Sequence, residues 1–323
     1  MKHIFGPVNS RRLGRSLGVD LFTEKICNLN CIYCEVGPTT RLTCDRREYT
    51  PTDGILTELE NYFSRSDQKG KIDTVTVTAS GEPSLHTGLG TILSFLRDRT
   101  DIRVALLTNG TTLDDAGVRG EASLADVVIP SLDSARVESF RRVDRPARCL
   151  DLDRIIEGLV VFSKQFSGQL WLEILFAEGI NDSDRDLQAL AETIARMRLD
   201  RIQINTVARP PLESFARPVA QAHLQEIGDY FQARFPGIPV DLLAKGAPTS
   251  DTDGGQEAAE EVSDLLAEIF EMLRRRPCTA ADINKTFHMG GPEKVEQSLA
   301  PFVQSGQLAL RQHSGLNYYQ VRD

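Results

Sequence analysis

The 323-residue sequence lacks several features that would place it in a specialised class of protein. It has no apolar run long enough to cross a bilayer, and residues 1–6 lack the apolar core of a secretory signal peptide. Positive charge is also scarce, since 37 Lys and Arg stand against 46 Asp and Glu, a formal net charge of −9. Large nucleic-acid footprints rely on clustered Lys and Arg, so this balance disfavours one without excluding a local basic patch. These absences predict a cytoplasmic protein with no membrane partner.

Cysteine is limited to six residues. Cys44, Cys149 and Cys278 are scattered over the chain, which does not resemble the disulfide framework of a small secreted domain. A second metal cluster would need a further group of cysteines, and the sequence has none. Cys44 lies near enough to the other three to be a fourth ligand in principle, but we expect it to be a loop or buried thiol.

Those other three cysteines are packed into the segment Cys27-Asn28-Leu29-Asn30-Cys31-Ile32-Tyr33-Cys34. Thiolates are soft ligands that favour iron–sulfur clusters, Zn and Cu(I). A structural zinc site closes with four protein ligands, whereas a [4Fe–4S] cluster held by three cysteines leaves one iron open. An open-iron cluster is therefore the leading interpretation. A zinc-binding loop or a set of unrelated cysteines is the alternative.

The rest of the chain alternates between strand-like and helical patterns. Strands are expected at 19–23, 72–79, 102–108, 126–130, 170–177, 201–206 and 238–243, and helices at 53–66, around 89–96, weakly after 110, and at 150–166, 182–198 and 218–235. About six strands joined by helical crossovers imply a parallel sheet. Periodicity alone does not separate a partial barrel from an open doubly wound sheet.

A change in composition divides the chain near its end. Residues 245–256 have the composition of a linker. Beyond it, an amphipathic helix over 257–275, two shorter helices ending at 287 and 305, and two strand-like runs around 313–315 predict a small winged-helix domain. We therefore expect three parts, over 1–244, 245–256 and 257–323.

Winged helices often read DNA through their third helix. Here that helix carries Glu293, Lys294, Glu296 and Gln297, and acidic residues crowd the first helix. The domain is therefore predicted to dock a protein or peptide, or to position a substrate as a lid, rather than to bind DNA.

Polar side chains lie at the ends of the predicted strands, where function collects in a parallel β/α architecture. Candidates are Gly81 and Glu82 after the second strand, Asn109 after the third, Ser131 and Asp133 after the fourth, Glu173 within the fifth, and Asn205 near the end of the sixth. A glycine lets backbone approach a ligand closely, and a carboxylate accepts from an ammonium. Asn109-Gly110 is equally a turn signal, and Asp133 is equally a helix N-cap. A charge inside an apolar strand is rarely buried unpaired, so Glu173 is expected to face the barrel mouth and a ligand.

The first eighteen residues are rich in Gly and Arg. Arg11, Arg12 and Arg15 are close enough in sequence to meet an anion of the substrate, such as a carboxylate or phosphate. The equally weighted alternative is a solvated segment that pairs with the acidic surface.

At Cys27, Cys31, Tyr33 and Cys34 the chain resembles the radical S-adenosylmethionine (SAM) superfamily, whose hallmark is Cys-x3-Cys-x-aromatic-Cys. The resemblance covers residues 17 to about 243 and implies a partial (β/α)6 TIM-like barrel. It implies a [4Fe–4S] cluster held by the three cysteines, with SAM chelating the open iron. One electron then cleaves SAM to methionine and a 5′-deoxyadenosyl radical, which removes hydrogen from a substrate. An electron donor such as a flavodoxin or ferredoxin, and sensitivity to oxygen, follow from the same resemblance.

The resemblance also suggests which residues contact SAM. Ser80-Gly81-Glu82 is similar to the Gly-Gly-Glu motif that holds the SAM amino group, with Ser80 in place of the first glycine. Small polar residues at positions such as Ser131 and Asp133 surround the SAM ribose or carboxylate in related sequences. The expected SAM contacts are Tyr33, Gly81, Glu82, Asn109, Ser131, Asp133, Glu173 and Asn205.

Three segments, at 6–18, 80–85 and 130–133, look most like the iron–sulfur oxidoreductases related to the tRNA wyosine-forming enzymes. Those enzymes carry further clustered cysteines for a second cluster, which this chain lacks, so wyosine chemistry itself is not expected. We expect an enzyme that modifies an RNA or a peptide or protein rather than a free small molecule. The competing hypothesis is a DNA-binding winged-helix regulator whose cysteines hold a structural or redox-sensing metal.

Overall fold

The computed structural model describes residues 2–10, 12–64, 72–243, 259–287 and 289–322. At its centre lies an eight-stranded sheet in the order β1-β2-β5-β6-β7-β8-β9-β10. The first two strands are antiparallel, and every later neighbouring pair is parallel. The strands are β1 (Ile4–Ser10), β2 (Gly14–Asp20), β5 (Thr74–Thr78), β6 (Arg103–Thr108), β7 (Val127–Pro130), β8 (Gln169–Phe176), β9 (Arg201–Thr206) and β10 (Val240–Leu242). The expected parallel sheet is therefore confirmed, and β1 and β10 form its two edges.

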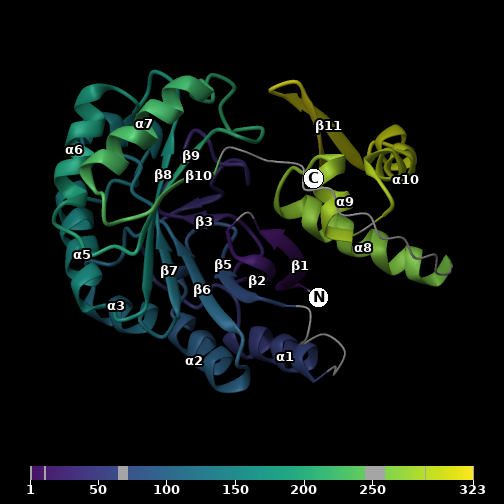
Figure 1. The fold of residues 1–323 in the computed structure, drawn as a ribbon. Helices are drawn as coiled ribbons and strands as arrows, with labels where there is room; N and C mark the ends of the chain where they lie inside the picture. Colours follow the sequence, from purple (N-terminus) through teal and green to yellow (C-terminus); the bar gives the residue numbers. More distant parts are fainter. Residues whose placement is uncertain (1, 11, 65–71, 244–258, 288, 323) are drawn as a thin grey trace.

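Helices connect the parallel strands and cover the outer face of the curved sheet, as Figure 1 shows. They are α1 (Thr52–Phe63), α2 (Leu89–Arg99), α3 (Ala116–Ala122), α4 (Val137–Val143), α5 (Leu152–Gln165), α6 (Asp184–Ile194) and α7 (Gln221–Arg234), with a 3-10 turn, η2, at Pro83–Leu85. In α5, the residues that predicted the helix, Ile155, Leu159 and Phe162 among them, are buried against the sheet. None of the described helices has the length and apolar character needed to cross a bilayer.

The sheet is buried on both faces. In β6, Val104 and Leu106 join the large apolar cluster, whereas Ala105 between them joins a second cluster with Ile129 and Trp171. Successive side chains of a strand point to opposite faces, so this division separates the outer, helix-covered face from the inner face. Burial on both faces explains why these strands read as continuous apolar runs.

The N-terminal hairpin is a departure from the sequence-based expectation. The strand expected at 19–23 lies at Gly14–Asp20, and it pairs with β1, which was not expected at all. The pairing register shifts between Phe5 and Val8. An irregular strand of this kind has no clean alternation of apolar and polar residues, so the sequence pattern does not reveal it.

The described residues after 258 form a C-terminal module, the name used below for residues 259–322. It contains α8 (Ala259–Arg275), α9 (Ala280–Phe287), α10 (Pro292–Gln304), β11 (Leu308–His313) and β12 (Leu316–Val321). This order of three helices and an antiparallel hairpin agrees with the expectation, while the winged-helix assignment stays a prediction. The linker predicted at 245–256 lies outside the described residues.

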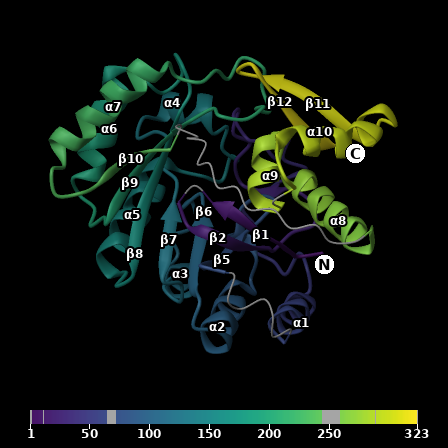
Figure 2. The ribbon, with the colours of Figure 1, turned by 45° about the vertical axis from the view of Figure 1, so that its right-hand side comes forward.

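The module packs against the edge of the barrel sheet. Val8 of β1 shares an apolar cluster with Ile269 and Met272 of α8. Figures 1 and 2 show α8 and α9 beside β1 in both views. At the other end of the module, Tyr318 Oη donates to the Ala208 carbonyl oxygen (2.8 Å). The module therefore contacts both the start of the barrel sheet and the segment after β9.

Candidate active site

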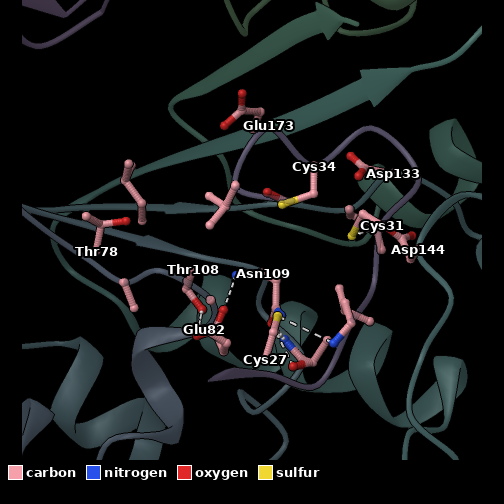
Figure 3. A pocket seen from close by; sticks show the side chains of 18 of the residues that line it. Cys27, Cys31, Cys34, Thr78, Glu82, Thr108, Asn109, Asp133, Asp144 and Glu173 are labelled. Atoms are coloured by element: carbon pink, nitrogen blue, oxygen red, sulfur yellow. Dashed lines mark hydrogen bonds between the residues drawn. The ribbon is translucent and has the colours of Figure 1, made fainter. Parts of the chain in front are cut away.

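The three clustered cysteines lie in one loop at the carboxyl ends of the parallel strands. The loop follows β2 and contains β3 (Ile26–Cys27), which pairs with β4 (Arg41–Leu42). Cys27 is 8% exposed, and Cys31 and Cys34 are half-buried. All three line one cavity of about 220 Å³, together with polar side chains from the strand ends (Figure 3). The expected gathering of cysteines and polar strand-end residues therefore occurs.

The turn Ser80-Gly81-Glu82 holds the cysteine loop in place. Ile26 N donates to Ser80 O (3.0 Å), and Glu82 N donates to Ile26 O (2.9 Å). Gly81 has φ +132°, and a Cβ there would lie 1.8 Å from the Ile26 carbonyl oxygen, so only glycine fits. The cysteine loop itself makes this close approach to Gly81. Gly81 also lines the cavity, and its contact with a ligand stays a prediction.

Glu82 is a buried carboxylate at the wall of the cavity, 1% exposed. Oε1 accepts from Ser84 N (3.0 Å), Ser84 Oγ (2.5 Å) and Thr108 Oγ1 (2.6 Å), and Oε2 accepts from Asn109 N (2.6 Å). Burial raises the pKa of the Glu82 carboxyl, and these hydrogen bonds oppose the rise. The donors fix the orientation of the carboxylate without a ligand.

Asn109 connects the end of β6 to the first cysteine. Its Nδ2 donates to Asn28 Oδ1 (2.8 Å) and lies 3.7 Å from Cys27 Sγ. Asn28, which the sequence-based set omitted, is fully buried and donates in turn to Thr111 Oγ1 (2.7 Å). Burial and the nearby Glu82 carboxylate raise the pKa of Cys27 to about 12. Asn109 therefore faces the first cysteine, and its contact with SAM stays a prediction.

Tyr33 and Cys31 meet a pair of buried carboxyls. Tyr33 Oη donates to Asp133 Oδ2, and Cys31 Sγ donates to Asp144 Oδ1 (3.3 Å). Burial raises the pKa of Asp133 to about 6, and burial with the Asp133 charge raises that of Asp144. Asp133 also accepts from Leu175 N (2.8 Å). The helix N-cap interpretation of Asp133 is wrong, because Arg136 occupies the N-cap of α4.

Glu173 faces the cavity from β8, as expected. Arg12 Nη1 donates to Glu173 Oε2 (2.6 Å) and to Gln203 Oε1 (3.1 Å), while Asn205 Nδ2 donates to Glu173 Oε1 (3.2 Å). Ser131 lines the same cavity, whereas Asn205 is not among the described residues that line it. The anion that Arg12 meets in the structure is thus the Glu173 carboxylate. Arg11 lies outside the described residues.

Lys25 is a site residue that the sequence analysis missed. It is 6% exposed, lines the cavity, and donates through Nζ to Cys34 Sγ (2.9 Å) and to Gly37 O. Its neighbours in the sequence, Glu24 and the apolar Ile26, give no signal that separates it from an ordinary surface lysine. Asp144 was also missed, because it lies at the charged end of α4, where an aspartate is ordinary.

The expectation for Cys44 as a loop or buried thiol is wrong. Cys44 is half-buried, Cys149 is exposed, and the two form a disulfide across 105 residues. This bond removes Cys44 from the possible ligands of the cysteine loop. It also joins the segment after β4 to the segment before α5, where Ala147 N donates to Asn28 O (2.9 Å). Sequence spacing alone cannot pair cysteines so far apart.

A comparison with protein families shows to which family the chain belongs. The model of the Radical SAM superfamily matches residues 23–206, more than half of the chain. The chain belongs to the radical SAM superfamily. It is accordingly an enzyme of the radical SAM type, and the cofactors of this type are a [4Fe–4S] cluster and SAM.

Two relatives extend the likeness over nearly all of the chain. A UPF0026 protein of Methanocaldococcus jannaschii is 34% identical over 298 residues, which is 90% of this chain and 92% of that protein. A protein of Brachyspira hyodysenteriae named GTPase Obg is 31% identical over 320 residues, 99% of this chain. The chain spans only 45% of the length of that second relative.

A solved structure shows the same fold. Streptococcus suis SuiB bound to S-adenosylmethionine aligns with a TM-score of 0.50 at 13% identity, over 70% of this chain and 51% of that one. The α/β fold with a mostly parallel, partial barrel sheet is therefore shared with that structure.

The residues of the cavity fit the two radical SAM cofactors. Three soft thiol ligands from a single loop open into it, and Lys25 places a positive charge beside Cys34. Among the described residues, no three His, Cys, Asp or Glu side chains converge on one metal ion, as a mononuclear zinc site requires. A cluster instead offers each thiolate its own iron, which suits thiols that open into one cavity without converging on a single ion.

Proposed function

We propose that Cys27, Cys31 and Cys34 each ligate one iron of a single [4Fe–4S] cluster and that SAM chelates the fourth. One observation carries this proposal: these three thiols, from one eight-residue loop, open into one cavity with the strand-end residues. The other described cysteines are accounted for elsewhere. Cys44 and Cys149 form a disulfide, and Cys278 is buried in the core of the C-terminal module.

The residues around the thiols have distinct roles in this proposal. When bound, the cluster supplies one electron that cleaves SAM to methionine and a 5′-deoxyadenosyl radical, which takes a hydrogen atom from the substrate and becomes 5′-deoxyadenosine. Glu82 presents an oriented carboxylate to the SAM ammonium. Lys25 offsets the negative charge of the thiolate ligands. The SAM-binding cavity is lined by Tyr33, Gly81, Asn109, Ser131, Asp133 and Glu173. Asn205 orients Glu173.

Enzymes of this type need an electron donor and a substrate. For the donor we propose a flavodoxin or a ferredoxin. For the substrate we propose a macromolecule, a peptide or protein or an RNA, because the C-terminal module adds a surface that a small metabolite does not require. The net charge of −9 favours the peptide over the RNA. The competing DNA-binding regulator has no support in the family membership, which is that of an enzyme.

Anaerobic reconstitution with iron and sulfide, followed by dithionite and SAM, tests the proposal. We expect about four irons per chain and release of 5′-deoxyadenosine, both lost in Cys27→Ala, Cys31→Ala and Cys34→Ala. Cys278→Ala is the matched control and keeps both, because Cys278 is buried and is not among the described residues that line the cavity. Tight binding of one zinc ion per chain, with no cluster and no cleavage of SAM, would contradict the proposal.

A further inference from the structure

Asp20 is a buried carboxylate that lies outside the cavity and has no part in the chemistry proposed above. It ends β2 and is 3% exposed. Its Oδ1 accepts from Phe22 N (3.1 Å) and Ser80 N (2.7 Å), and its Oδ2 accepts from Ser80 Oγ (2.7 Å). Two of these three donors belong to Ser80, so the carboxylate fixes the start of the Ser80-Gly81-Glu82 turn.

The counter-charge for Asp20 comes from the C-terminal module. Arg275, the last residue of α8, places Nε 3.6 Å from Asp20 Oδ2, and the two side chains are 14% and 5% exposed. Within the part of the chain that the structure describes, no other Lys, Arg or His side chain pairs with Asp20 at this range. A buried carboxylate depends on such a partner, because few waters reach it.

Several contacts hold the Arg275 side chain beside Asp20. Its Nη2 donates to the Lys2 carbonyl oxygen (2.9 Å), and its Nη1 donates to the Glu271 carbonyl oxygen (2.9 Å). The guanidinium carbon lies 4.6 Å from the centroid of the Phe5 ring. The side chain is therefore fixed by β1 on one side and by its own helix on the other.

Ser80 transmits this arrangement to the cavity. Its carbonyl oxygen accepts from Ile26 N, the residue before Cys27, and Ile26 O accepts from Glu82 N. Gly81 lies so close to Ile26 that the turn and the cysteine loop cannot shift independently of each other. A displacement of Ser80 therefore moves Cys27 and Glu82, which both line the cavity.

We propose that Arg275 is a positioning residue through which the C-terminal module sets the affinity for SAM. The Arg275–Asp20 ion pair holds the turn in the position that binds the cofactor, and the module thereby takes part in the cofactor site without touching it. This inference rests on the proposed contact of Gly81 and Glu82 with SAM. A purely structural role, in which Arg275 only attaches the module to β1, predicts lower stability with unchanged affinity for SAM.

The test compares reconstituted full-length variants. Arg275→Met is expected to retain its iron and to raise the dissociation constant for SAM about tenfold, the scale of an ordinary coupling between sites. Arg275→Lys keeps the charge and is expected to recover most of the affinity. Arg274→Ala is the matched control, since Arg274 is 59% exposed and pairs with Glu271 rather than Asp20. The affinity is read by equilibrium dialysis and by the change in the cluster's EPR spectrum on adding SAM.

Asp20→Asn provides a second route if Arg275→Met does not fold. It is expected to weaken SAM binding similarly. The double variant Asp20→Asn, Arg275→Met is expected to lose less SAM-binding free energy than the sum of the losses in the two single variants. Wild-type affinity in both Arg275→Met and Asp20→Asn would overturn the positioning role. Glu82→Gln, measured in parallel, separates the two proposals, because unchanged affinity in that variant refutes the proposed role of Glu82 instead.

Discussion

At the scale of single residues, the site depends on side chains and backbone atoms whose neighbours come from elsewhere in the chain. Gly81 is necessary because Ile26, fifty-five positions earlier, passes against it. Lys25 and Asp144 belong to the site because folding brings each beside a cysteine. The type of residue and its spacing therefore predicted the cysteines, Gly81 and Glu82. Lys25 and Asp144 could not be found from the sequence, because only a distant contact brings them to the cavity.

Gly81→Ala is predicted to disrupt the cofactor site. The new Cβ would lie 1.8 Å from the Ile26 carbonyl oxygen, and φ is +132°, so the turn and the cysteine loop must separate. We expect a loss of about 3 kcal/mol or more in the free energy of unfolding, and little iron after reconstitution. Gly120→Ala in α3 is the control, because nothing lies within 4 Å of its added Cβ. Equal iron contents in the two variants would refute the prediction.

His86 is predicted to make stability depend on pH. It is fully buried, its Nδ1 accepts from Gly88 N (2.9 Å), and its Nε2 therefore donates to Thr50 O (2.7 Å). Burial lowers its pKa, so the unfolded chain binds the proton more readily. This contribution to stability is full above pH about 6.5 and is lost as the pH falls from there towards the folded-state pKa.

Urea unfolding of the wild type and His86→Gln between pH 5 and 8 measures this effect. The difference in free energy of unfolding between the two is expected to shrink as the pH falls. A constant difference would show that the pKa of His86 is the same in the folded and unfolded states. His223 shifts in the opposite direction, since Glu226 raises its pKa, and it is unchanged in this comparison.

At the scale of elements, apolar periodicity was sufficient where an element buries a regular face. β9 lies at the expected residues 201–206, and α5 and α7 lie within the expected ranges. Periodicity failed for the irregular strand β1 and for the short helix α4, whose seven residues hold too few turns to show a pattern. It also could not pair Cys44 with Cys149, because the disulfide depends on how two loops meet at the end of the sheet.

The double variant Cys44→Ser, Cys149→Ser is predicted to lower the free energy of unfolding by about 2–4 kcal/mol. The bond closes a loop between residues 105 apart and so restricts the unfolded chain. Chemical unfolding with and without dithiothreitol measures the effect. Reductant should bring the wild type to the stability of the double variant and leave the variant itself unchanged. A wild type insensitive to reductant would contradict this explanation.

At the scale of the whole molecule, the barrel and the C-terminal module contact each other at several points. They share the apolar cluster around Val8, and the hairpin at the far end contacts Val207 through His313 Nε2 (3.1 Å) and Ala208 through Tyr318. The charge pair between Arg275 and Asp20 adds a third connection. A module attached at several points is expected to unfold with the barrel rather than before it.

Calorimetry is therefore predicted to show one cooperative unfolding transition for the full chain. Val8→Ala removes apolar contacts at the junction, where Val8 is 6% exposed, and is expected to lower the free energy of unfolding by about 1–2 kcal/mol. The single transition should move to lower temperature as a whole. Two separate transitions in the wild type would show that the parts unfold independently.

The Cys44–Cys149 bond has a consequence for the connectivity of the chain. Residues 44–149 form a covalent ring, and this ring includes the Ser80-Gly81-Glu82 turn, Asn109, Asp133 and Asp144. A single cut of the backbone inside the ring opens it without dividing the molecule. The fragment with Cys27, Cys31 and Cys34 then stays tethered to the fragment with the later strands, so a nicked chain migrates as one species until it is reduced.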